Sequence, residues 1–142
     1  MRLNFTVIGD AVNIASRLES TNKVYGSTII IGPETRRLAG DRIVVRELDR
    51  LAVYGRAGGL QIYELLAMAD EAGGAPDWAK AYEAGLASWR TRDFTAAITA
   101  FEQVLQIRKH DAASSVMIER CRAQLANPSD ADWDGTTIAK SK

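Results

Sequence analysis

The chain has 142 residues, which is enough for one domain or for part of a domain with an appendage. Its 18 Lys and Arg residues balance 18 Asp and Glu residues, so no positive field for attracting nucleic acid is implied. No run approaches the ~20 apolar residues that a membrane-spanning helix needs, and no charged-then-apolar leader opens the chain. We therefore expect a cytoplasmic chain with no nucleic-acid partner and no membrane segment of its own, which leaves membrane attachment of a full-length parent open.

The first informative stretch is residues 5–19, with the sequence F-T-V-I-G-D-A-V-N-I-A-S-R-L-E. It predicts an apolar strand that turns at Gly-Asp into a helix, with Asp10 as the helix cap. Asn13 and Arg17 are four residues apart, so both side chains lie on one helix face. An amide and a guanidinium placed together suit an anion or a developing negative charge. Taken alone, the same pair also fits an ordinary solvated helix face.

The pattern V-I-G-D-x-V-N-x-A-x-R-L-E resembles the nucleotidyl cyclase domain of the class III adenylate and guanylate cyclases. Residues 21–31, T-N-K-V-Y-G-S-T-I-I-I, resemble the Tyr-Gly turn and buried strand that follow the catalytic helix in this family. Residues 48–56, L-D-R-L-A-V-Y-G-R, resemble the family's closing strand pair, written L-D-x-x-x-V-K-G-K, and residues 60–65 resemble its last strand. The resemblance covers about residues 3–66, a little under half of the chain.

The resemblance implies that ATP is converted to cyclic AMP and pyrophosphate in intracellular signal transduction. In the family, the Asn and Arg stabilise the transition state, so Asn13 and Arg17 are the expected catalytic residues. Thr6 matches a position that contacts the base, and it favours ATP over GTP moderately. Arg56 stands where the family has a Lys that contacts the terminal phosphates, so a planar guanidinium replaces a point charge there.

The metal-binding half of the family has no counterpart in the sequence. Class III cyclases bind two divalent ions, Mg²⁺ or Mn²⁺, through aspartates in an F-x-D-[IL] strand and in a Gly-Asp hairpin, and their sites form between two cyclase domains. We therefore expect no metal site in this chain, a second cyclase domain in a homodimer as the source of the aspartates, and no activity of the chain alone. The chain is interpreted as a cyclase fragment whose N-terminal half is missing. The alternative is a non-catalytic dimerisation or regulatory module.

Residues 32–66 predict the remaining elements of this first block. Gly32-Pro33-Glu34-Thr35 is typical of a helix start, and the short helix is expected to stop at Gly40. Residues 43–45 and 48–53 predict extended chain, and Gly58-Gly59 predicts a turn before a final strand at 60–66. The expected fold class is α+β: residues 1–68 as the C-terminal half of a ferredoxin-like nucleotidyl cyclase domain, followed by a linker at 69–76.

Residues 77–127 predict a helical extension. Apolar residues advance at helical spacing in two stripes, namely Trp78, Tyr82, Leu86 and Trp89, then Ala97, Ile98, Phe101, Val104 and Leu105. Small residues at Gly85 and Ala97 resemble a tetratricopeptide (TPR) helix pair, in which two helices approach closely. Two interpretations stay open: a TPR-like repeat that binds a protein partner, or a helical hairpin that packs on the cyclase sheet.

The end of the chain carries weaker signals. A third helix at about residues 112–125 places Val116, Cys121 and Leu125 inward. The lone Cys121 and His110 are interpreted as packing or surface residues, because no second Cys or ligand cluster accompanies them. Residues 128–142 have no periodicity and are predicted to be a disordered tail, with Trp133 as its one anchor.

Overall fold

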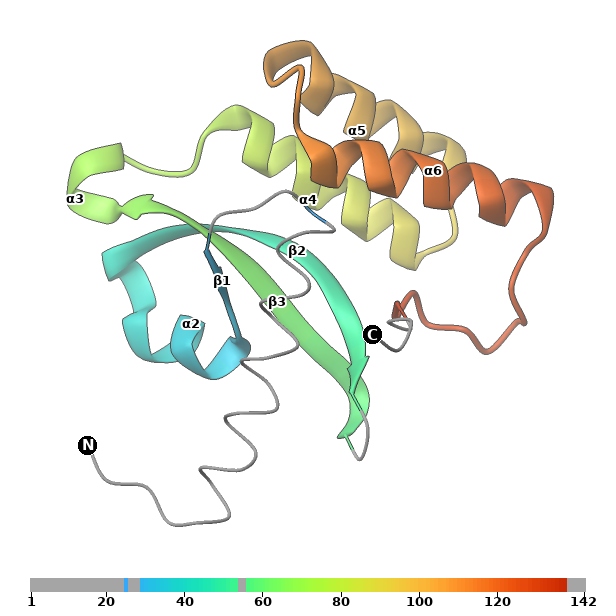
Figure 1. Cartoon of the computed structure of the whole chain (residues 1–142), viewed down its shortest axis with the longest axis horizontal. Helices are drawn as coiled ribbons and strands as arrows, with labels where there is room; N and C mark the ends of the chain where they lie inside the picture. The colour runs from blue at the N-terminus through green and yellow to red at the C-terminus, as the bar shows by residue number, and fades with distance from the viewer. Residues whose placement is uncertain (1–24, 26–28, 54–55, 138–142) are drawn as a thin grey trace.

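The fold combines a small sheet with three long helices, as a computed structural model of the chain shows (Figure 1). The structure describes Tyr25, residues 29–53 and residues 56–137. Its elements in chain order are β1 (Ile30–Ile31), α2 (Pro33–Ala39), a 3₁₀ turn (Gly40–Arg42), β2 (Ile43–Val53), β3 (Arg56–Met68), α3 (Ala69–Ala72), α4 (Asp77–Arg90), α5 (Phe94–Ile107) and α6 (Ala112–Ala126). The α+β class predicted from the sequence is confirmed.

The sheet is antiparallel, with strand order β1-β3-β2. The two extended segments predicted at 43–45 and 48–53 are one strand, β2, which pairs with β3 along its whole length. The turn predicted at Gly58-Gly59 is wrong, because β3 already begins at Arg56 and residues 57–59 form a bulge opposite Ala52. Gly59 has φ 78°, and a Cβ there would lie 2.7 Å from Cγ of Arg50. The glycine thus serves a bulge, which needs the same positive φ as a turn.

The short helix α2 begins and ends where the sequence predicts. Gly32 is its N-cap, Pro33 occupies its first position, and Gly40 follows its last residue with φ 56°. The segment expected to be a linker, 69–76, includes the single-turn helix α3, which ends at Gly73 in the left-handed conformation. The segment expected to be a linker therefore contains one turn of helix before its glycines.

Helices α4 and α5 pack through the two predicted apolar stripes. Tyr82, Leu86 and Trp89 of α4 are buried, as are Ala97 and Phe101 of α5. The rings of Tyr82 and Phe101 lie 5.1 Å apart between centroids. Gly85 is required at their crossing, because a Cβ there would lie 2.6 Å from the Phe101 ring. The predicted close approach of the two helices is confirmed, whereas a TPR-type repeat stays a prediction.

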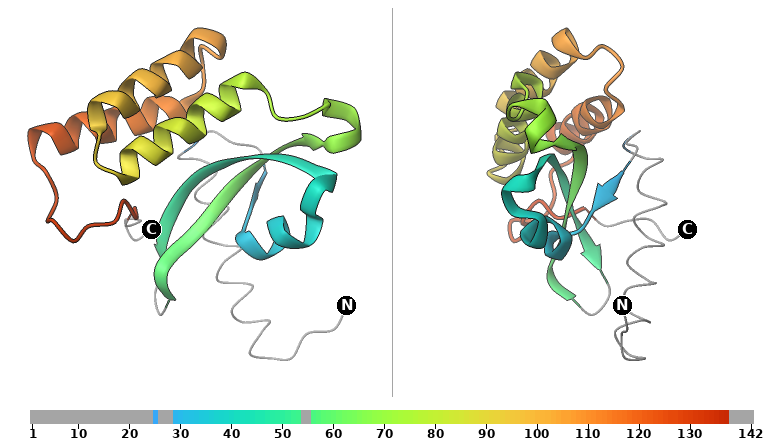
Figure 2. Two further views of the ribbon diagram at one scale, coloured as in Figure 1. Left: turned by 180° about the vertical axis from the view of Figure 1, so that it is seen from behind. Right: turned by 90° about the vertical axis from the view of Figure 1, so that its left-hand side faces the viewer.

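Helix α6 follows α5 and buries one side against it. Ala113, Met117 and Cys121 are fully buried, and Val116 packs at the margin of the core. The inward placement predicted for Leu125 is wrong, because this side chain is 52% exposed. The C-terminal turns of α6 extend beyond the ends of α4 and α5 (Figures 1 and 2).

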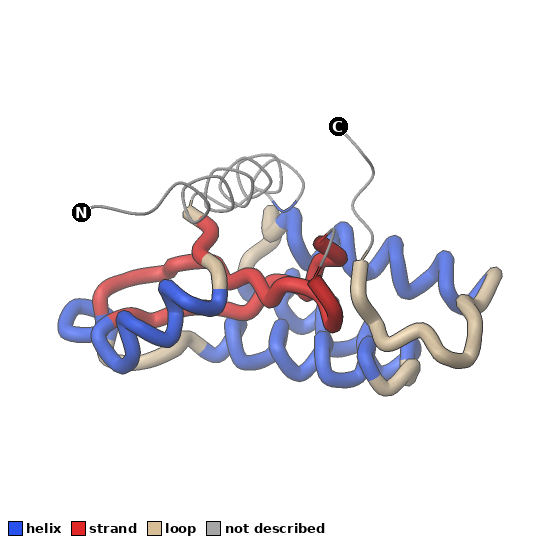
Figure 3. Tube along the Cα trace, turned by 90° about the horizontal axis from the view of Figure 1, so that it is seen from below, coloured by secondary structure: helices blue, strands red, loops and turns tan. Residues whose placement is uncertain are grey.

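The tail predicted to be disordered over 128–142 is ordered in its described part, through Thr137. The segment returns from α6 toward the strands, as Figure 3 shows. The Trp89 indole donates to the carbonyl of Gly135 (2.9 Å), and Trp133 packs against Trp89 with centroids 5.0 Å apart, so the predicted anchor is confirmed. Thr137 forms a parallel bridge with Leu51. Hydrogen bonds that lack any sequence periodicity fix this segment, which explains why periodicity alone missed it.

One edge of the sheet is covered by groups from helix α4 and from the C-terminal segment. Along β2, the amide of Glu47 donates to the Glu83 carboxylate (2.8 Å), and the Tyr82 hydroxyl donates to the carbonyl of Leu48 (2.7 Å). Farther along the strand, the amide of Thr137 donates to the carbonyl of Arg50 (2.8 Å). Unpaired backbone groups at a strand edge invite further strand pairing, and these contacts block it at β2. None of the described helices is long and apolar enough to cross a bilayer.

Candidate functional site

The residues expected to act in catalysis lie mostly outside the described part of the chain. This applies to Thr6, Asn13 and Arg17. Arg56 is the first residue of β3, and the course of its backbone is described. Their roles therefore stay predictions, and the described residue that follows Arg17 most closely in the chain is Tyr25, which is 2% exposed.

Opposite charges on β2 and α6 meet in the interior of the molecule. Strand β2 carries Arg46 and Asp49, which are 1% and 0% exposed. Helix α6 presents Asp111 at its N-cap and Arg120 in its third turn. Arg46 pairs with Asp111, and Arg120 pairs with Asp49. We call these two ion pairs and their hydrogen-bond partners the β2–α6 seam.

Arg46 is the centre of one half of the seam. Its guanidinium donates to both carboxylate oxygens of Asp111, at 2.8 and 3.0 Å, and its Nε donates to Glu64 at 3.1 Å. The rings of Tyr82 and Trp78 lie 4.6 and 5.0 Å from the guanidinium carbon. A planar fork that binds two carboxylates and stacks on aromatic rings is a task for Arg and not for Lys. This arrangement compensates the burial of the charge.

The pKa values in this half of the seam follow from the same contacts. Burial lowers the pKa of Arg46, but the hydrogen bonds and charges of Asp111 and Glu64 outweigh it, so the pKa is raised. Burial raises the pKa of Asp111, but its bonds to Arg46 and to the Ser114 hydroxyl (2.6 Å) bring the pKa below its usual value. Asp111 also accepts from the amide of Ser114 at 3.2 Å, which caps α6. One carboxylate therefore serves both the ion pair and the helix start.

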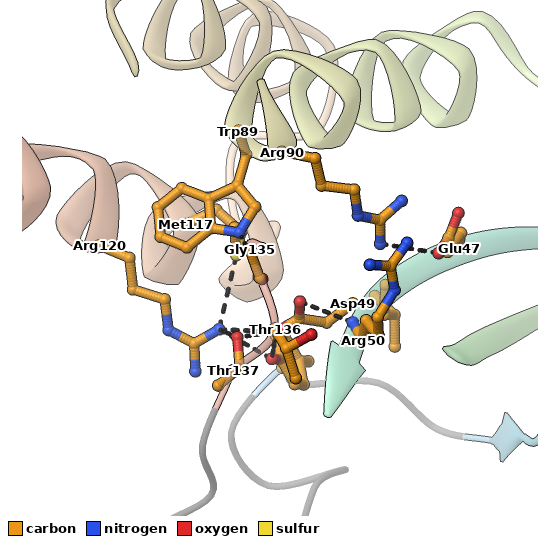
Figure 4. Close-up of polar contacts among 12 residues, drawn as sticks. Glu47, Asp49, Arg50, Trp89, Arg90, Met117, Arg120, Gly135, Thr136 and Thr137 are labelled. Atoms are coloured by element: carbon orange, nitrogen blue, oxygen red, sulfur yellow. Dashed lines mark hydrogen bonds and ion pairs between the residues drawn. The ribbon is translucent and has the colours of Figure 1, made fainter. Parts of the chain in front are cut away.

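The other half of the seam converges on Asp49 (Figure 4). Its Oδ2 accepts from the Tyr25 hydroxyl, from Arg120 Nη1 (2.9 Å) and from the Thr137 hydroxyl (2.7 Å). Its Oδ1 accepts from the amide of Arg50 at 2.7 Å. Arg120 Nη1 also lies 2.9 Å from the Tyr25 hydroxyl oxygen. Four segments that are distant in the sequence therefore meet at one carboxylate.

Burial sets the protonation state of the tyrosines at this seam. It raises the pKa of Tyr25 strongly, and the negative charge of Asp49 adds to the effect. Burial likewise raises the pKa of Tyr82 well above its usual value. Both hydroxyls therefore remain protonated donors across the physiological range, and neither is suited to act as a general base at neutral pH.

A third Arg–carboxylate pair joins α4 to the same strand. Arg90 Nη2 donates to Glu47 at 2.8 Å, and both side chains are partly exposed, at 20% and 16%. The Gln61 amide donates to the same carboxylate at 3.2 Å. This pair resembles the Arg120–Asp49 pair in chemistry, but it does not contact Tyr25.

The β2–α6 seam and the Arg90–Glu47 pair position the helices. These described clusters offer no catalytic group of their own. Within the described ranges, no three His, Cys, Asp or Glu side chains are placed to hold a metal ion. Cys121 is fully buried, and burial raises the pKa of its thiol to about 11, so it is a poor nucleophile at neutral pH. His110 is exposed. The interpretation of Cys121 as a packing residue and His110 as a surface residue is confirmed.

An open pocket lies between the end of β3 and the loop before α4. It has a volume of about 690 Å³ and is walled mainly by apolar groups, among them Ile29, Leu65 and Pro76. Arg108 is at its margin, where it stacks on Trp78 at 4.1 Å and lies 3.6 Å from Asp111. Its one cation is already paired, so the pocket does not assemble a reactive site.

Sequence reasoning missed the residues of the seam. Arg46 and Asp49 lie among apolar residues of β2, and both are buried. A charged residue within an apolar strand can therefore indicate a buried charge. Asp111 precedes a predicted helix and was recognisable as a cap. Which carboxylate would meet which arginine depends on contacts such as Arg46–Asp111, 65 residues apart, and no local pattern specifies them.

Comparison with known proteins connects the chain to one enzyme class. It is 30% identical over 125 residues, 84% of this chain, to the terminal-differentiation specific adenylate cyclase of Dictyostelium discoideum. It is 38% identical over 65 residues to adenylate cyclase 1 of Rhizobium meliloti (strain 1021), and 39% identical over 69 residues to an adenylate cyclase of Anabaena cylindrica. These two matches each cover 46% of the chain. The chain is related to adenylate cyclases.

The relationship concerns a small part of each relative. The matched stretches are 6%, 10% and 14% of the Dictyostelium, Rhizobium and Anabaena proteins. No family model matches the chain, and no solved structure matches it. The Dictyostelium match leaves only about a sixth of the chain outside it, so it necessarily includes α4 and α5. The similarity to an adenylate cyclase thus extends from the strands into the helical layer.

Proposed function

We propose that the chain is part of a class III adenylate cyclase, which converts ATP to cyclic AMP and pyrophosphate in the cytoplasm. The observation that carries this proposal is the 38–39% identity to two adenylate cyclases. It is supported by the pattern of residues 5–19, in which a Gly-Asp turn precedes Asn13 and Arg17. The role proposed for this chain is to supply the transition-state donors of the reaction.

In the proposed reaction, the 3′-hydroxyl oxygen of ATP attacks the α-phosphorus, and pyrophosphate leaves. Negative charge builds on the phosphoryl and bridging oxygens, where preorganised donors lower the barrier most effectively. Arg17 would donate to the phosphoryl oxygens, and Asn13 would orient the ribose. Arg56 would contact the terminal phosphates, and Thr6 would contact the adenine. Removing one such donor costs roughly a hundredfold to a thousandfold in rate.

The metal ions, Mg²⁺ or Mn²⁺, are assigned to a second cyclase domain in a dimer. The described residues do not fit a two-metal site, because the buried carboxylates of Asp49, Glu64 and Asp111 are each bound by an arginine. Aspartates of that second domain would hold the ions, which would supply Lewis-acid stabilisation of the phosphate charge. The groups of this chain bind and orient the nucleotide.

Complementation between two chains tests the proposal. The partner is an adenylate cyclase domain that keeps its metal aspartates but has its own transition-state Asn and Arg replaced by Ala. Adding the 142-residue chain should restore cyclic AMP formation, whereas the chain alone with Mg-ATP or Mn-ATP should form none. Asn13→Ala and Arg17→Ala should each lower the restored rate by about two orders of magnitude, with a much smaller change in nucleotide affinity.

Two further variants sharpen the assay. Lys23→Ala is the matched control, since it removes a cation six residues from Arg17 to which no role is assigned, and it should leave the rate unchanged. Thr6 substitutions should alter the preference for ATP over GTP. Near-wild-type rates for Arg17→Ala would overturn the catalytic role. Binding to the partner without any restored activity would favour the alternative, a non-catalytic dimerisation or regulatory module.

A further inference from the structure

Asp49 joins the helical layer to the segment that follows the proposed catalytic residues. Its carboxylate accepts from Tyr25, from Arg120 of α6 and from Thr137 of the C-terminal segment. Asp49 is completely buried, and the side chain of Arg120 is 27% exposed. This cluster therefore connects strand β2, helix α6, the C-terminal segment and Tyr25. Figure 4 shows the contacts of Asp49 with Arg120 and Thr137.

Tyr25 occupies a special place in the sequence. It follows Arg17 by eight residues and Asn13 by twelve. It is 2% exposed, and its hydroxyl contacts both Asp49 and Arg120. Eight residues after Arg17, the chain therefore reaches a residue that the seam holds in place.

We propose that Asp49 and Arg120 are positioning residues for the segment that carries Asn13 and Arg17. They act through Tyr25: the carboxylate orients its hydroxyl, and the guanidinium of α6 holds the carboxylate and the hydroxyl together. The proposal rests on the proposed function, and it gives the helical layer a part in that function. A misplacement of reacting groups by about 1 Å can cost a hundredfold in rate.

The competing interpretation is that Arg120 merely attaches α6 to the sheet. Arg90 makes it possible to separate these two interpretations. It forms another Arg–carboxylate pair, between α4 and Glu47, two residues from Asp49 on the same strand. Both pairs join a helix to β2, but only the Arg120 pair contacts Tyr25. Arg90→Ala is therefore the matched control for Arg120→Ala.

The first measurement is amide hydrogen exchange of the 142-residue chain in peptides that contain Tyr25. Arg120→Ala and Tyr25→Phe should each speed exchange there by about tenfold or more, the scale of losing one hydrogen bond to a charged group. Arg120→Lys should restore part of the protection, because a single donor can still reach Asp49. Arg90→Ala should leave exchange at Tyr25 unchanged. Equal effects of Arg90→Ala and Arg120→Ala, or no protection at Tyr25 in the unmodified chain, would overturn the proposal.

The second measurement uses the complementation assay. Arg120→Ala and Tyr25→Phe should lower kcat several-fold while KM for ATP stays within twofold, and Arg90→Ala should change neither. A rise in KM alone, or an equal loss of kcat in Arg90→Ala, would contradict a positioning role. If the unmodified chain restores no activity, the proposed function fails, and the exchange measurement by itself decides whether the seam holds Tyr25.

Discussion

Two interfaces of the helical layer are built by different chemistry. Between α4 and α5 the contact is aromatic and apolar, with Tyr82 against Phe101 and Trp89 against Phe94 at a centroid distance of 5.4 Å. Between β2 and α6 the contact depends on buried charges, with Arg46 and Asp49 on the strand facing Asp111 and Arg120 on the helix. An apolar interface tolerates small shifts, whereas each buried charge requires its own partner.

The difference shows what each interface contributes. Apolar burial supplies stabilisation in proportion to the area removed from water, without selecting one register sharply. The seam places a positive and a negative group on β2 against a negative and a positive group on α6, so a shifted or reversed α6 would bring like charges together. We infer that the α4–α5 contact stabilises the helical layer and that the seam fixes where this layer lies on the sheet.

Removing the central arginine of the seam should have the largest effect. Arg46→Ala leaves the buried carboxylate of Glu64 without its cation and leaves Asp111 with the longer contact to Arg108 alone, at 3.6 Å. Breaking a buried ion pair in this way costs about 3–5 kcal/mol. Chemical denaturation monitored by tryptophan fluorescence should record that loss in the free energy of unfolding. Arg37→Ala is the control, because its pair with Glu34 is exposed to solvent and should contribute little to stability. Similar losses for the two variants would contradict the importance of the seam.

The carboxylate of Asp111 makes the stability of the same interface depend on pH. Contacts with Arg46 and Ser114 lower the pKa of Asp111 in the folded chain, despite the opposing effect of burial. A lowered folded-state pKa stabilises the fold above the unfolded-state value of about 3.9, and this contribution is lost as the pH falls through the folded-state pKa. Asp111→Asn should cost roughly 1.5–3 kcal/mol at pH 7, the scale of hydrogen bonds to a charged group.

Melting temperatures measured from pH 7 to pH 3 test whether Asp111 makes the stability fall as the pH falls. The unmodified chain should lose stability steeply at the acid end, and Asp111→Asn should show a shallower loss there, so that the two curves converge. Curves that stay parallel would show that the carboxylate does not contribute through its charge. The asparagine keeps a side-chain oxygen for capping α6, so the helix start is preserved in the variant.

The apolar interface should be sensitive to size instead of charge. In Gly85→Ala, the new Cβ would lie 2.6 Å from the ring of Phe101, which is fully buried and cannot easily move aside. Overpacking of this kind costs typically 1–3 kcal/mol, and the higher helix propensity of Ala offsets about 1 kcal/mol of it. We expect a net loss of up to about 2 kcal/mol in the free energy of unfolding. Gly85→Ala combined with Phe101→Leu should recover part of it, and no recovery would argue against this clash.

The sequence predicts these two interfaces unequally. The spacing of Tyr82, Leu86 and Trp89 reveals the buried face of α4, because a helix that packs on a core repeats its apolar residues every three to four positions. The short helix α2 can be predicted equally well, because the backbone preferences of Pro33 and Gly40 favour the start and the end of a helix. These signals are local, and the fold class follows from them.

The seam and the tail depend on contacts between distant residues. Arg46 and Asp111 are 65 residues apart, and Asp49 and Thr137 are 88 residues apart, so neither pair has a sequence period. Gly58-Gly59 illustrates a different limit, because a positive φ serves a bulge as well as a turn. Of the candidate site, the pattern around Asn13 and Arg17 could be recognised by resemblance, whereas the contact that connects Tyr25 to α6 could not.

The smallest effect on stability is expected at Leu125, where the apolar pattern of α6 continues beyond the residues that pack against other helices. Leu125 follows Cys121 by four residues, so periodicity places it inward, yet it is 52% exposed while Cys121 is fully buried. Leu125→Ala removes a side chain that makes little buried contact, and surface substitutions of this kind change stability by about 0.5 kcal/mol or less. Leu86→Ala in α4, where the side chain is 1% exposed, should instead cost about 2–5 kcal/mol. Denaturation of both variants measures the contrast. A loss at Leu125 that approaches the loss at Leu86 would show that another surface covers the end of α6 in solution.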